Sequence, residues 1–374
     1  MKLAFFGSSL LSAYWNGAAT YWRGIIHALS QRGHQVTFYE PDTLDRQQHR
    51  DIANPSWARV VVYPCRCEMD ALVAVGDAVG RDDVIIKCSG VGIYDELLES
   101  AVLERRRPGQ VVAFWDVDAP ATLDRMQRDP EDSLRRLVEA YDLVLTYGGG
   151  EPVVKAYRAL GARDCVPIYN AVDPRTHYPV PAEPRFMADL AFLGNRLPDR
   201  EARVAEFFLK PAEMCASRRF LLGGSGWSDK AEVRELANVV YLGHVYTTMH
   251  NAFNCTPRAV LNVSRESMAR CGHSPATRVF EAAGAGACII TDAWPGLERF
   301  LEPGVEVLVA DSGEAVAAHL ERLTPERAAR IGRAARARVL REHTYEHRAA
   351  ELERVLARYL PVSGSSSVQG VEVP

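Results

Sequence analysis

One stretch of the sequence, residues 271–286, combines a helix start with side chains that suit a nucleotide. Ser274 is of the type expected at an N-cap, and Pro275 is of the type expected at the first helical position. The free N–H groups and the dipole of such a helix start favour an anion such as a diphosphate. Two turns on, Glu281 lies on the same side as Ser274, where a carboxylate accepts hydrogen bonds from a ribose diol. The pattern therefore indicates a nucleotide-sugar site, with an ordinary capped helix and a surface glutamate as the alternative.

Glycines follow the apolar runs in both halves of the chain. Open parallel sheets bind ligands outside the carboxyl ends of their strands, so two such rims facing one another predict a cleft between domains. Strand-to-helix turns also use glycine for purely conformational reasons. The glycines in question are Gly7, Gly148, Gly149, Gly150, Gly194, Gly223, Gly224 and Gly243.

The elements that must position these residues are short apolar strands alternating with helices, a rhythm typical of parallel sheets. Residues 20–31 and 201–209 have helical patterns. A proline-rich segment over 173–184 interrupts the rhythm, because each proline fixes φ and removes a hydrogen-bond donor. The predicted strands are 3–6, 35–39, 59–63, 84–88, 111–115 and 143–147 before that segment, and 189–193, 219–222, 239–242, 259–263, 287–291 and 305–309 after it.

The C-terminal run over 324–360 has the pattern of two helices interrupted near His343 and Thr344. The segment after it is rich in Ser, Gly and Val and is expected to be disordered. We therefore expect an N-terminal α/β domain at 1–173, a C-terminal α/β domain at 185–343, a final helix at 344–360 and a disordered tail at 361–374.

The composition is that of an ordinary globular protein and excludes several classes. The 44 Lys and Arg against 48 Asp and Glu leave a formal charge of −4, so nucleic acid is not an expected partner. No window approaches 18 uninterrupted apolar residues and the run at Met1–Phe6 is too short for a signal peptide, so we expect a cytoplasmic protein without a transmembrane segment. The eight cysteines are expected to be buried, reduced thiols. Cys65 and Cys67 form a lone C-x-C pair, and no metal site is predicted.

The segment around Glu281 resembles the group 1 glycosyltransferase families, and most closely the family named for the spore maturation protein CgeB. The resemblance runs from Val111 to Leu360 and is weaker before that. The matching sequence segments are Thr277–Ala282 with Gly286, Thr291–Glu298, Glu302–Gly304, His343–Arg348, Phe192–Asn195 with Pro198–Arg200, and Ile168–Asp173.

This resemblance implies a GT-B fold, in which two Rossmann-like domains with parallel sheets face an interdomain cleft. It implies metal-independent transfer of a sugar from a nucleotide-diphosphate sugar, with no further cofactor, to an acceptor hydroxyl on a glycan, lipid, protein or small molecule. The C-terminal domain would hold the donor, the N-terminal domain the acceptor, and the final helix would return to the N-terminal domain. In the wider family two glutamates contact the donor. Glu281 matches the second of them, whereas His273 stands where the first is expected.

Donor-side candidates follow from the need to stabilise a leaving diphosphate by charge and by helix ends. Arg196, Arg200, Arg265 and Arg278 are the cations beside predicted strand ends. Arg196 is preferred among them because it directly follows the turn at 194–195. The full donor-side set, including the expected base contacts at 243–245, is Gly194, Asn195, Arg196, Gly224, Gly243, His244, Val245, Arg265, Ser274, Thr277, Arg278 and Glu281.

Acceptor-side candidates follow the strand at 111–115. Asp116 and Asp118 lie where a general base would deprotonate a hydroxyl, and their D-x-D spacing, which binds metal in another glycosyltransferase fold, is interpreted as coincidence. His273 is the third catalytic candidate, as a hydrogen-bond donor to a phosphate or a sugar hydroxyl. The turn at 16–20 is expected to border the acceptor. The aromatic residues beside it, which stack on a sugar or pack in the core, are Trp15, Tyr21 and Trp22.

Three other functions are open at this point. An NAD-dependent oxidoreductase would use Glu40 at the end of the second strand, but the loop at 7–11 lacks the G-x-G-x-x-G spacing. A non-catalytic nucleotide-sugar-binding relative is suggested by His273. A GT-B sugar-nucleotide epimerase would share the architecture and Glu281, and would convert a nucleotide sugar without an acceptor.

Overall fold

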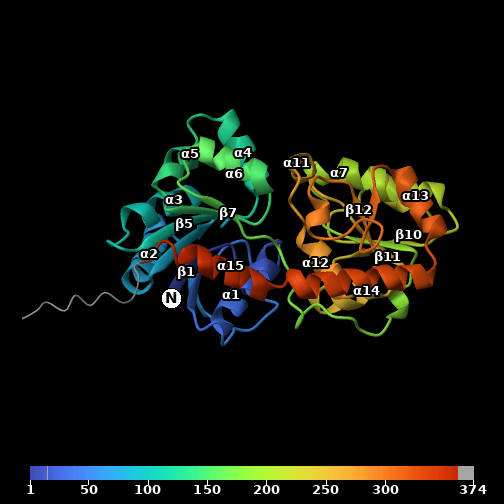
Figure 1. Ribbon diagram of the computed structural model, residues 1–374, viewed down its shortest axis with the longest axis horizontal. Helices are drawn as coiled ribbons and strands as arrows, with labels where there is room; N and C mark the ends of the chain where they lie inside the picture. Colours follow the sequence, from blue (N-terminus) through green and yellow to red (C-terminus); the bar gives the residue numbers. More distant parts are fainter. Residues whose placement is uncertain (15, 361–374) are drawn as a thin grey trace, which may run out of the picture.

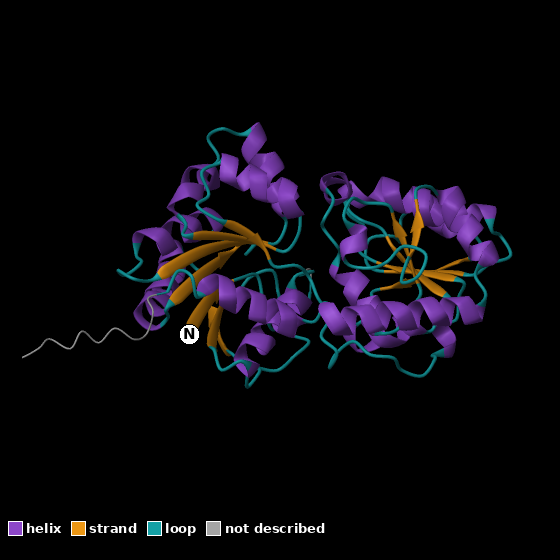
Figure 2. Ribbon diagram, in the orientation of Figure 1, coloured by secondary structure: helices purple, strands orange, loops and turns teal. Residues whose placement is uncertain are grey.

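The computed structural model describes residues 1–14 and 16–360. The chain forms two α/β halves that lie side by side (Figure 1). Figure 2 shows that each half has a layer of strands with helices on both faces. The expected disordered tail at 361–374 and the aromatic candidate Trp15 lie outside the described residues.

The first half contains seven parallel strands in the order β3-β2-β1-β4-β5-β6-β7. All six predicted strands of this half are confirmed. Strand β7 was not predicted, and it is an edge strand of three residues that ends in proline. The strands are β1 (Lys2–Phe6), β2 (Gln35–Pro41), β3 (Arg59–Tyr63), β4 (Val84–Cys88), β5 (Val111–Asp116), β6 (Leu143–Thr146) and β7 (Cys165–Pro167). The helices are α1 (Ala19–Gln31), α2 (Glu68–Arg81), α3 (Asp95–Glu104), α4 (Ala119–Arg128), α5 (Ser133–Leu137), η1 (Val138–Ala140) and α6 (Gly150–Ala159).

The second half contains six parallel strands in the order β10-β9-β8-β11-β12-β13. All six predicted strands are confirmed, although β13 begins three residues later than predicted. The strands are β8 (Leu190–Leu193), β9 (Phe220–Gly223), β10 (Val239–Gly243), β11 (Ala259–Asn262), β12 (Ile289–Asp292) and β13 (Leu308–Ala310). The helices are η2 (Pro184–Phe186), α7 (Pro198–Val204), η3 (Ala205–Leu209), α8 (Lys210–Met214), α9 (Ala231–Glu235), η4 (Thr247–Met249), α10 (His250–Cys255), α11 (Glu266–Cys271), α12 (Thr277–Gly284), η5 (Leu297–Arg299), α13 (Gly313–Arg322), α14 (Pro325–Glu342) and α15 (Tyr345–Leu356).

Each sheet is buried on both faces, which explains why its strands are almost continuously apolar. In β1, Ala4 and Phe6 enter the core on one face of the sheet, while Leu3 and Phe5 enter the core on the other. The second sheet likewise separates two apolar clusters. The apolar clusters on the two faces of each sheet hold its strands in place and thereby position the strand ends.

The chain passes between the halves at two places that lie side by side. Val172, just before the proline-rich segment, forms a parallel bridge with Thr344. The N–H of Val172 donates to the His343 carbonyl at 2.9 Å, and the N–H of Tyr345 donates back to the Val172 carbonyl at 3.1 Å. Burial lowers the pKa of His343 to about 3, so this ring is neutral at the crossing. The predicted helix interruption at 343–344 is confirmed, because α14 ends at Glu342 and α15 begins at Tyr345.

The final helix α15 packs against α1 of the first half, as Figure 1 shows. Arg32, the C-cap residue of α1, forms an ion pair with Glu353 of α15. The closest approach is at Gly24, where a Cβ atom would overlap the ring of Tyr345, a buried residue. The absence of a side chain at Gly24 is therefore what lets the last helix dock.

Gly24→Ala is expected to lower the melting temperature, because the added methyl group forces the Tyr345 ring out of its packing at a cost of about 1–3 kcal/mol. The matched control is Gly76→Ala in the exposed face of α2, where a Cβ atom meets nothing within 4 Å. There the higher helix propensity of alanine stabilises the protein by about 0.5–1 kcal/mol. Scanning calorimetry checks both variants, and equal melting temperatures would contradict this account of the docking.

Candidate functional site

The helix predicted to bind an anion starts two residues later than expected. Ala276 occupies the N-cap position of α12, so the prediction of Ser274 as N-cap and Pro275 as first helical residue was wrong. The buried amide of Asn170 is the reason. It donates to the Pro275 carbonyl at 3.0 Å and accepts from the Thr277 hydroxyl at 3.1 Å, which holds the preceding segment extended. Among the described residues no side chain caps α12, so its first N–H groups remain available to a ligand.

Two arginine side chains lie together at this helix start without a carboxylate partner. Arg278 is in the first turn of α12, and Arg200 is in α7. One terminal nitrogen of each lies 3.0 Å from the position that a Cβ on Gly194 would take. Within the described chain neither guanidinium has a hydrogen-bond or ion-pair partner, and Nε of Arg200 and Nη1 of Arg278 are buried. Like charges this close repel unless an anion lies between them.

The pKa of Arg278 reflects this environment. Burial, and after it the neighbouring charge of Arg200, lower the pKa of Arg278 to about 9, while Glu281 opposes the shift. The pKa of Arg200 is also lowered, again mainly by burial. The Arg278 guanidinium lies over the ring of Phe192, with its Cζ 5.2 Å from the ring centre, which partly compensates the missing carboxylate.

The turn after β8 brings the two arginines together. Gly194 donates its N–H to the Gly223 carbonyl at 2.9 Å, and the Asn195 side chain accepts from the N–H of Ser225 at 2.9 Å. Gly224 has a φ of +118°, and a Cβ there would overlap the backbone of Gly194. Small residues therefore let the turns after β8 and β9 pack directly on one another.

The other two predicted cations are already paired. Arg196, the preferred candidate, contacts Glu201 at 2.7 Å and Asp229 at 3.0 Å. Arg265, which follows β11, forms ion pairs with Asp199 at 2.6 Å and with Asp118 of the first half. The geometry therefore favours Arg200 over Arg196 as the partner of Arg278. Arg196 and Arg265 hold the surrounding loops in place.

Glu281 lies one turn beyond Arg278 and faces two histidines. Its carboxylate is 3.7 Å from Nε2 of His177, which belongs to the proline-rich segment. His250, the first residue of α10, is the second neighbour, and its Nε2 donates to the Val245 carbonyl at 3.2 Å. Val245 is buried and follows Gly243 at the end of β10, whereas His244 is exposed. The structure thus brings the expected ribose and base contacts to one side of α12. Neither histidine was predicted, because neither belongs to a motif.

On the acceptor side the two aspartates differ sharply. Asp116 is fully buried and accepts four hydrogen bonds, from the Ser89 hydroxyl, the Asp118 N–H, the Thr122 hydroxyl and, at 2.5 Å, the Tyr157 hydroxyl. These hydrogen bonds hold the Asp116 carboxylate in a fixed orientation. Asp118 has one oxygen on Arg265 and a second, buried oxygen without a partner in the described chain. Burial raises the pKa of Asp118, against the opposing charge of Arg265.

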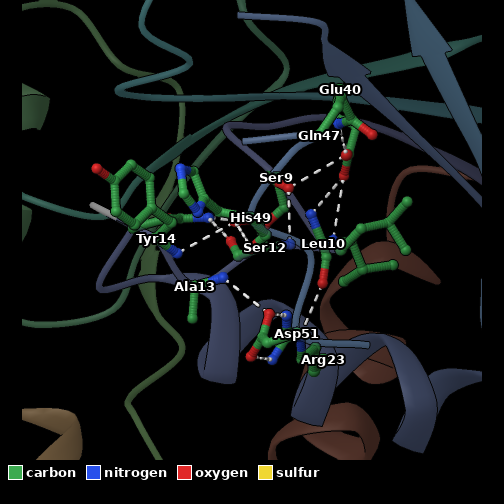
Figure 3. Close-up of polar contacts among 12 residues, drawn as sticks. Ser9, Leu10, Ser12, Ala13, Tyr14, Arg23, Glu40, Gln47, His49 and Asp51 are labelled. Carbon is green, nitrogen blue, oxygen red and sulfur yellow. Dashed lines mark hydrogen bonds and ion pairs between the residues drawn. The ribbon is translucent and has the colours of Figure 1, made fainter. Parts of the chain in front are cut away.

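A second buried carboxylate, that of Glu40, holds the loop after β1 in place (Figure 3). Glu40 accepts from the Ser9 hydroxyl at 3.1 Å, the Leu10 N–H at 2.6 Å and the Gln47 amide at 2.6 Å. Asp51 accepts from the N–H of Ala13 and pairs with Arg23 on the other side of the loop. Glu40 therefore has no lone pair directed at a ribose, which removes the main support for an NAD site.

The aromatic residues beside this loop do not border the acceptor. Tyr21 and Trp22 are both buried in the core under α15. The Tyr21 hydroxyl donates to the Ile168 carbonyl at 2.8 Å. Asn16 uses its side chain inside the loop, where it accepts from the Ser8 hydroxyl at 2.9 Å. Core packing is thus the role of both described aromatic candidates.

The rims of the two sheets touch at His273. This residue has a φ of +48°, donates its N–H to the Pro295 carbonyl at 2.7 Å and accepts from the Gly149 N–H at 2.8 Å. A Cβ on Gly150 or on Gly296 would overlap its side chain, and its Nδ1 is buried without a partner among the described residues. His273 is therefore wedged between a glycine loop of each half. The expected cleft is closed at this point by backbone contact.

Comparisons with known proteins agree with this architecture. Residues 200–354 match the family model described as Glycosyl transferase-like. A search of curated proteins found no match. The structure of Anabaena HepE with UDP-glucose is similar at a TM-score of 0.68 and 15% identity, over 96% of this chain and 100% of HepE. Sucrose-phosphate synthase from Thermosynechococcus elongatus has a TM-score of 0.67 and 15% identity, over 96% and 98% of the two chains. A glycosyltransferase from Rickettsia africae has a TM-score of 0.63 and 11% identity, over 97% and 99%.

The chain therefore has the GT-B fold, with parallel sheets of seven and six strands, and the predicted fold class is confirmed. In the described part of the chain, no helix is both long and apolar enough to cross a membrane. The eight cysteines are free thiols, but only Cys88, Cys165 and Cys288 are buried as expected, and Cys67 is exposed.

Arg278→Met is expected to raise the melting temperature of the ligand-free protein, by about 1 kcal/mol of stability, because it removes one of two repelling, partly buried charges and keeps the packing on Phe192. Arg196→Met is the matched control, since Arg196 has carboxylate partners and its removal brings no such gain. Thermal unfolding without ligand checks both. A lower melting temperature for Arg278→Met would contradict the description of an unpaired charge.

Proposed function

We propose that this chain is a glycosyltransferase that binds a nucleoside-diphosphate sugar on its second half and transfers the sugar to an acceptor hydroxyl held by the first half. The observation that carries the proposal is the pair of partnerless guanidiniums of Arg200 and Arg278 at the uncapped start of α12. Two positive charges and a helix N-terminus together match a diphosphate better than any neutral ligand. From the matching sequence segments, we also propose that the chain belongs to the glycosyltransferase family named for CgeB.

The remaining donor contacts follow from the direction in which α12 runs. With the diphosphate at Arg200 and Arg278, the ribose lies beside the next turn, where Glu281 accepts hydrogen bonds from its diol. The base then extends toward the backbone at 243–245. HepE has been solved with UDP-glucose, so a UDP-sugar is the first donor to test. The sequence match over 200–354 covers all of these α12 contacts.

Departure of the nucleotide is the step that this site assists. As the bond between the sugar and the diphosphate breaks, negative charge grows on the leaving oxygen, and fixed positive groups stabilise it without reorganisation. Arg200, Arg278 and the first N–H groups of α12 supply that charge compensation. We propose that they make the transfer independent of a divalent metal.

The acceptor proton goes to one of two groups. If the sugar configuration is inverted, Asp118 is the side-chain base, because its second oxygen is partnerless and burial raises its pKa. If the configuration is retained, the departing phosphate oxygen takes the proton and Asp118 positions the acceptor. In both cases Arg265 holds Asp118 against the donor half.

A non-catalytic nucleotide-sugar-binding protein is the second candidate. It is favoured by His273, which replaces a family acid and is confined between Gly150 and Gly296. Such a protein binds a donor and releases no nucleotide with any acceptor. A GT-B epimerase would instead convert the nucleotide sugar with no acceptor present.

The proposed ribose contact is tested by Glu281→Ala. Loss of a charged hydrogen-bond acceptor for the diol costs about 1.5–3 kcal/mol, so the Kd for UDP should rise by roughly 10- to 150-fold. Isothermal titration calorimetry with UDP and UDP-glucose measures it. Glu235→Ala, an exposed glutamate on α9, is the control and leaves the Kd unchanged. An unaltered Kd for Glu281→Ala rules out the ribose assignment.

The role of Asp118 is tested by Asp118→Asn. We expect kcat for UDP release from UDP-glucose to fall by roughly 100-fold with the donor Kd unchanged, because the group acts on the acceptor or on water. Asp124→Asn is matched to it, since Asp124 also pairs across the domains, with Arg270 at 2.9 Å, but lies at the surface. If both variants lose the same activity, Asp118 serves only to hold the domains together.

A further inference from the structure

Three potential metal ligands converge beside the proposed ribose position. They come from three separate segments: His177 from the proline-rich segment, His250 from the start of α10 and Glu281 from α12. One ligand atom of each lies within 4.8 Å of the other two. All three side chains are largely buried, which keeps them from pointing freely into solvent.

The hydrogen bonds of the two histidines leave one nitrogen of each ring available as a ligand. Nε2 of His250 donates to the Val245 carbonyl, so its Nδ1 carries a lone pair. Nδ1 of His177 contacts the Thr176 hydroxyl at 2.9 Å, so its Nε2 faces Glu281. Metal-binding histidines in proteins typically have this arrangement, with the second nitrogen fixed by a carbonyl or another polar group.

The three side chains do not satisfy one another. Nε2 of His177 and the Glu281 oxygen are 3.7 Å apart, which is too long for a hydrogen bond. Zinc bonds of about 2.0–2.2 Å place neighbouring ligand atoms about 3.4 Å apart in a tetrahedron, so small rotations bring the group to bonding geometry. A dication placed there also meets the charge of Arg278 one turn away, which Glu281 partly offsets.

We propose that His177, His250 and Glu281 form a site for a transition-metal dication, with Zn²⁺ the best match to two imidazoles and one carboxylate, and that the bound metal competes with the nucleotide. The competition rests on the proposed function, because it follows only if Glu281 also binds the ribose. Metal binding itself does not depend on that function. Zinc at this position is an inhibitor, since it occupies the carboxylate that the donor needs.

The metal site is tested with Co²⁺ as a spectroscopic probe of the full chain after treatment with a chelator. We expect the visible absorption of a tetrahedral site in the wild-type protein and at least roughly 10-fold weaker Co²⁺ binding in His177→Ala and His250→Ala. His49→Ala, an exposed histidine of the first half, is the control and keeps the wild-type signal. Absence of the visible bands, their survival in both variants, or a sulfur charge-transfer band from a cysteine site would each overturn the proposal.

The competition is tested by titrating UDP with and without Zn²⁺. We expect Zn²⁺ to weaken UDP binding to the wild-type chain at least roughly 10-fold and to leave binding to His177→Ala unchanged. If Co²⁺ binds as expected but UDP is not displaced, the competition is refuted while the metal site stands. If UDP does not bind even to the metal-free chain, the proposed function fails and the Co²⁺ result still decides the metal site.

Discussion

Repulsion between the guanidiniums of Arg200 and Arg278 is the constraint on which the proposed site depends. A folded protein rarely leaves two such groups together without a carboxylate, because the charges cost free energy when water is removed from them. Here the fold holds them in place from two directions, with Arg200 on α7 and Arg278 on α12. Glycine at 194 leaves room for both guanidiniums, because a Cβ there would lie 3.0 Å from a terminal nitrogen of each. A lower stability of the ligand-free protein is a common consequence of a binding site built for an anion.

The junction between the halves is built from the same strand ends. Asn170 from the first half sets where α12 begins, and Gly149 binds the backbone of His273 directly before it. Asp118 reaches Arg265 across the same gap. The N-terminus of α12 is consequently positioned by residues of both halves. Any change in the angle between the halves therefore alters the anion site as well as the cleft.

The strands were predictable from the sequence because each sheet is buried on both faces, so each strand is an apolar run. The predicted boundaries of elements were wrong where a residue distant in the sequence determines them. The start of α12 depends on the Asn170 amide, which no local pattern around Ser274 reveals. The edge strand β7 is too short to form a pattern of its own.

Within the site, residue types were easier to predict than their partners. Arg278 and Glu281 stand out through the helix start and the family resemblance. Arg196 was preferred because it directly follows the turn at 194–195, and its pairing with Asp229 could not be predicted because Asp229 lies far along the chain. From the sequence, Asp116 is a candidate general base. Only the folded chain shows that the hydroxyls of Tyr157 and Ser89 donate hydrogen bonds to its carboxylate. His177 comes from a proline-rich segment that has no periodicity, so only three-dimensional proximity relates it to Glu281.

A crystal structure of the chain with UDP tests the central claim most directly. The account predicts that the diphosphate lies between Arg200 and Arg278, each within hydrogen-bond distance of a phosphate oxygen, with the ribose diol on Glu281. A diphosphate bound elsewhere, with both guanidiniums still lacking an anionic partner, would contradict it.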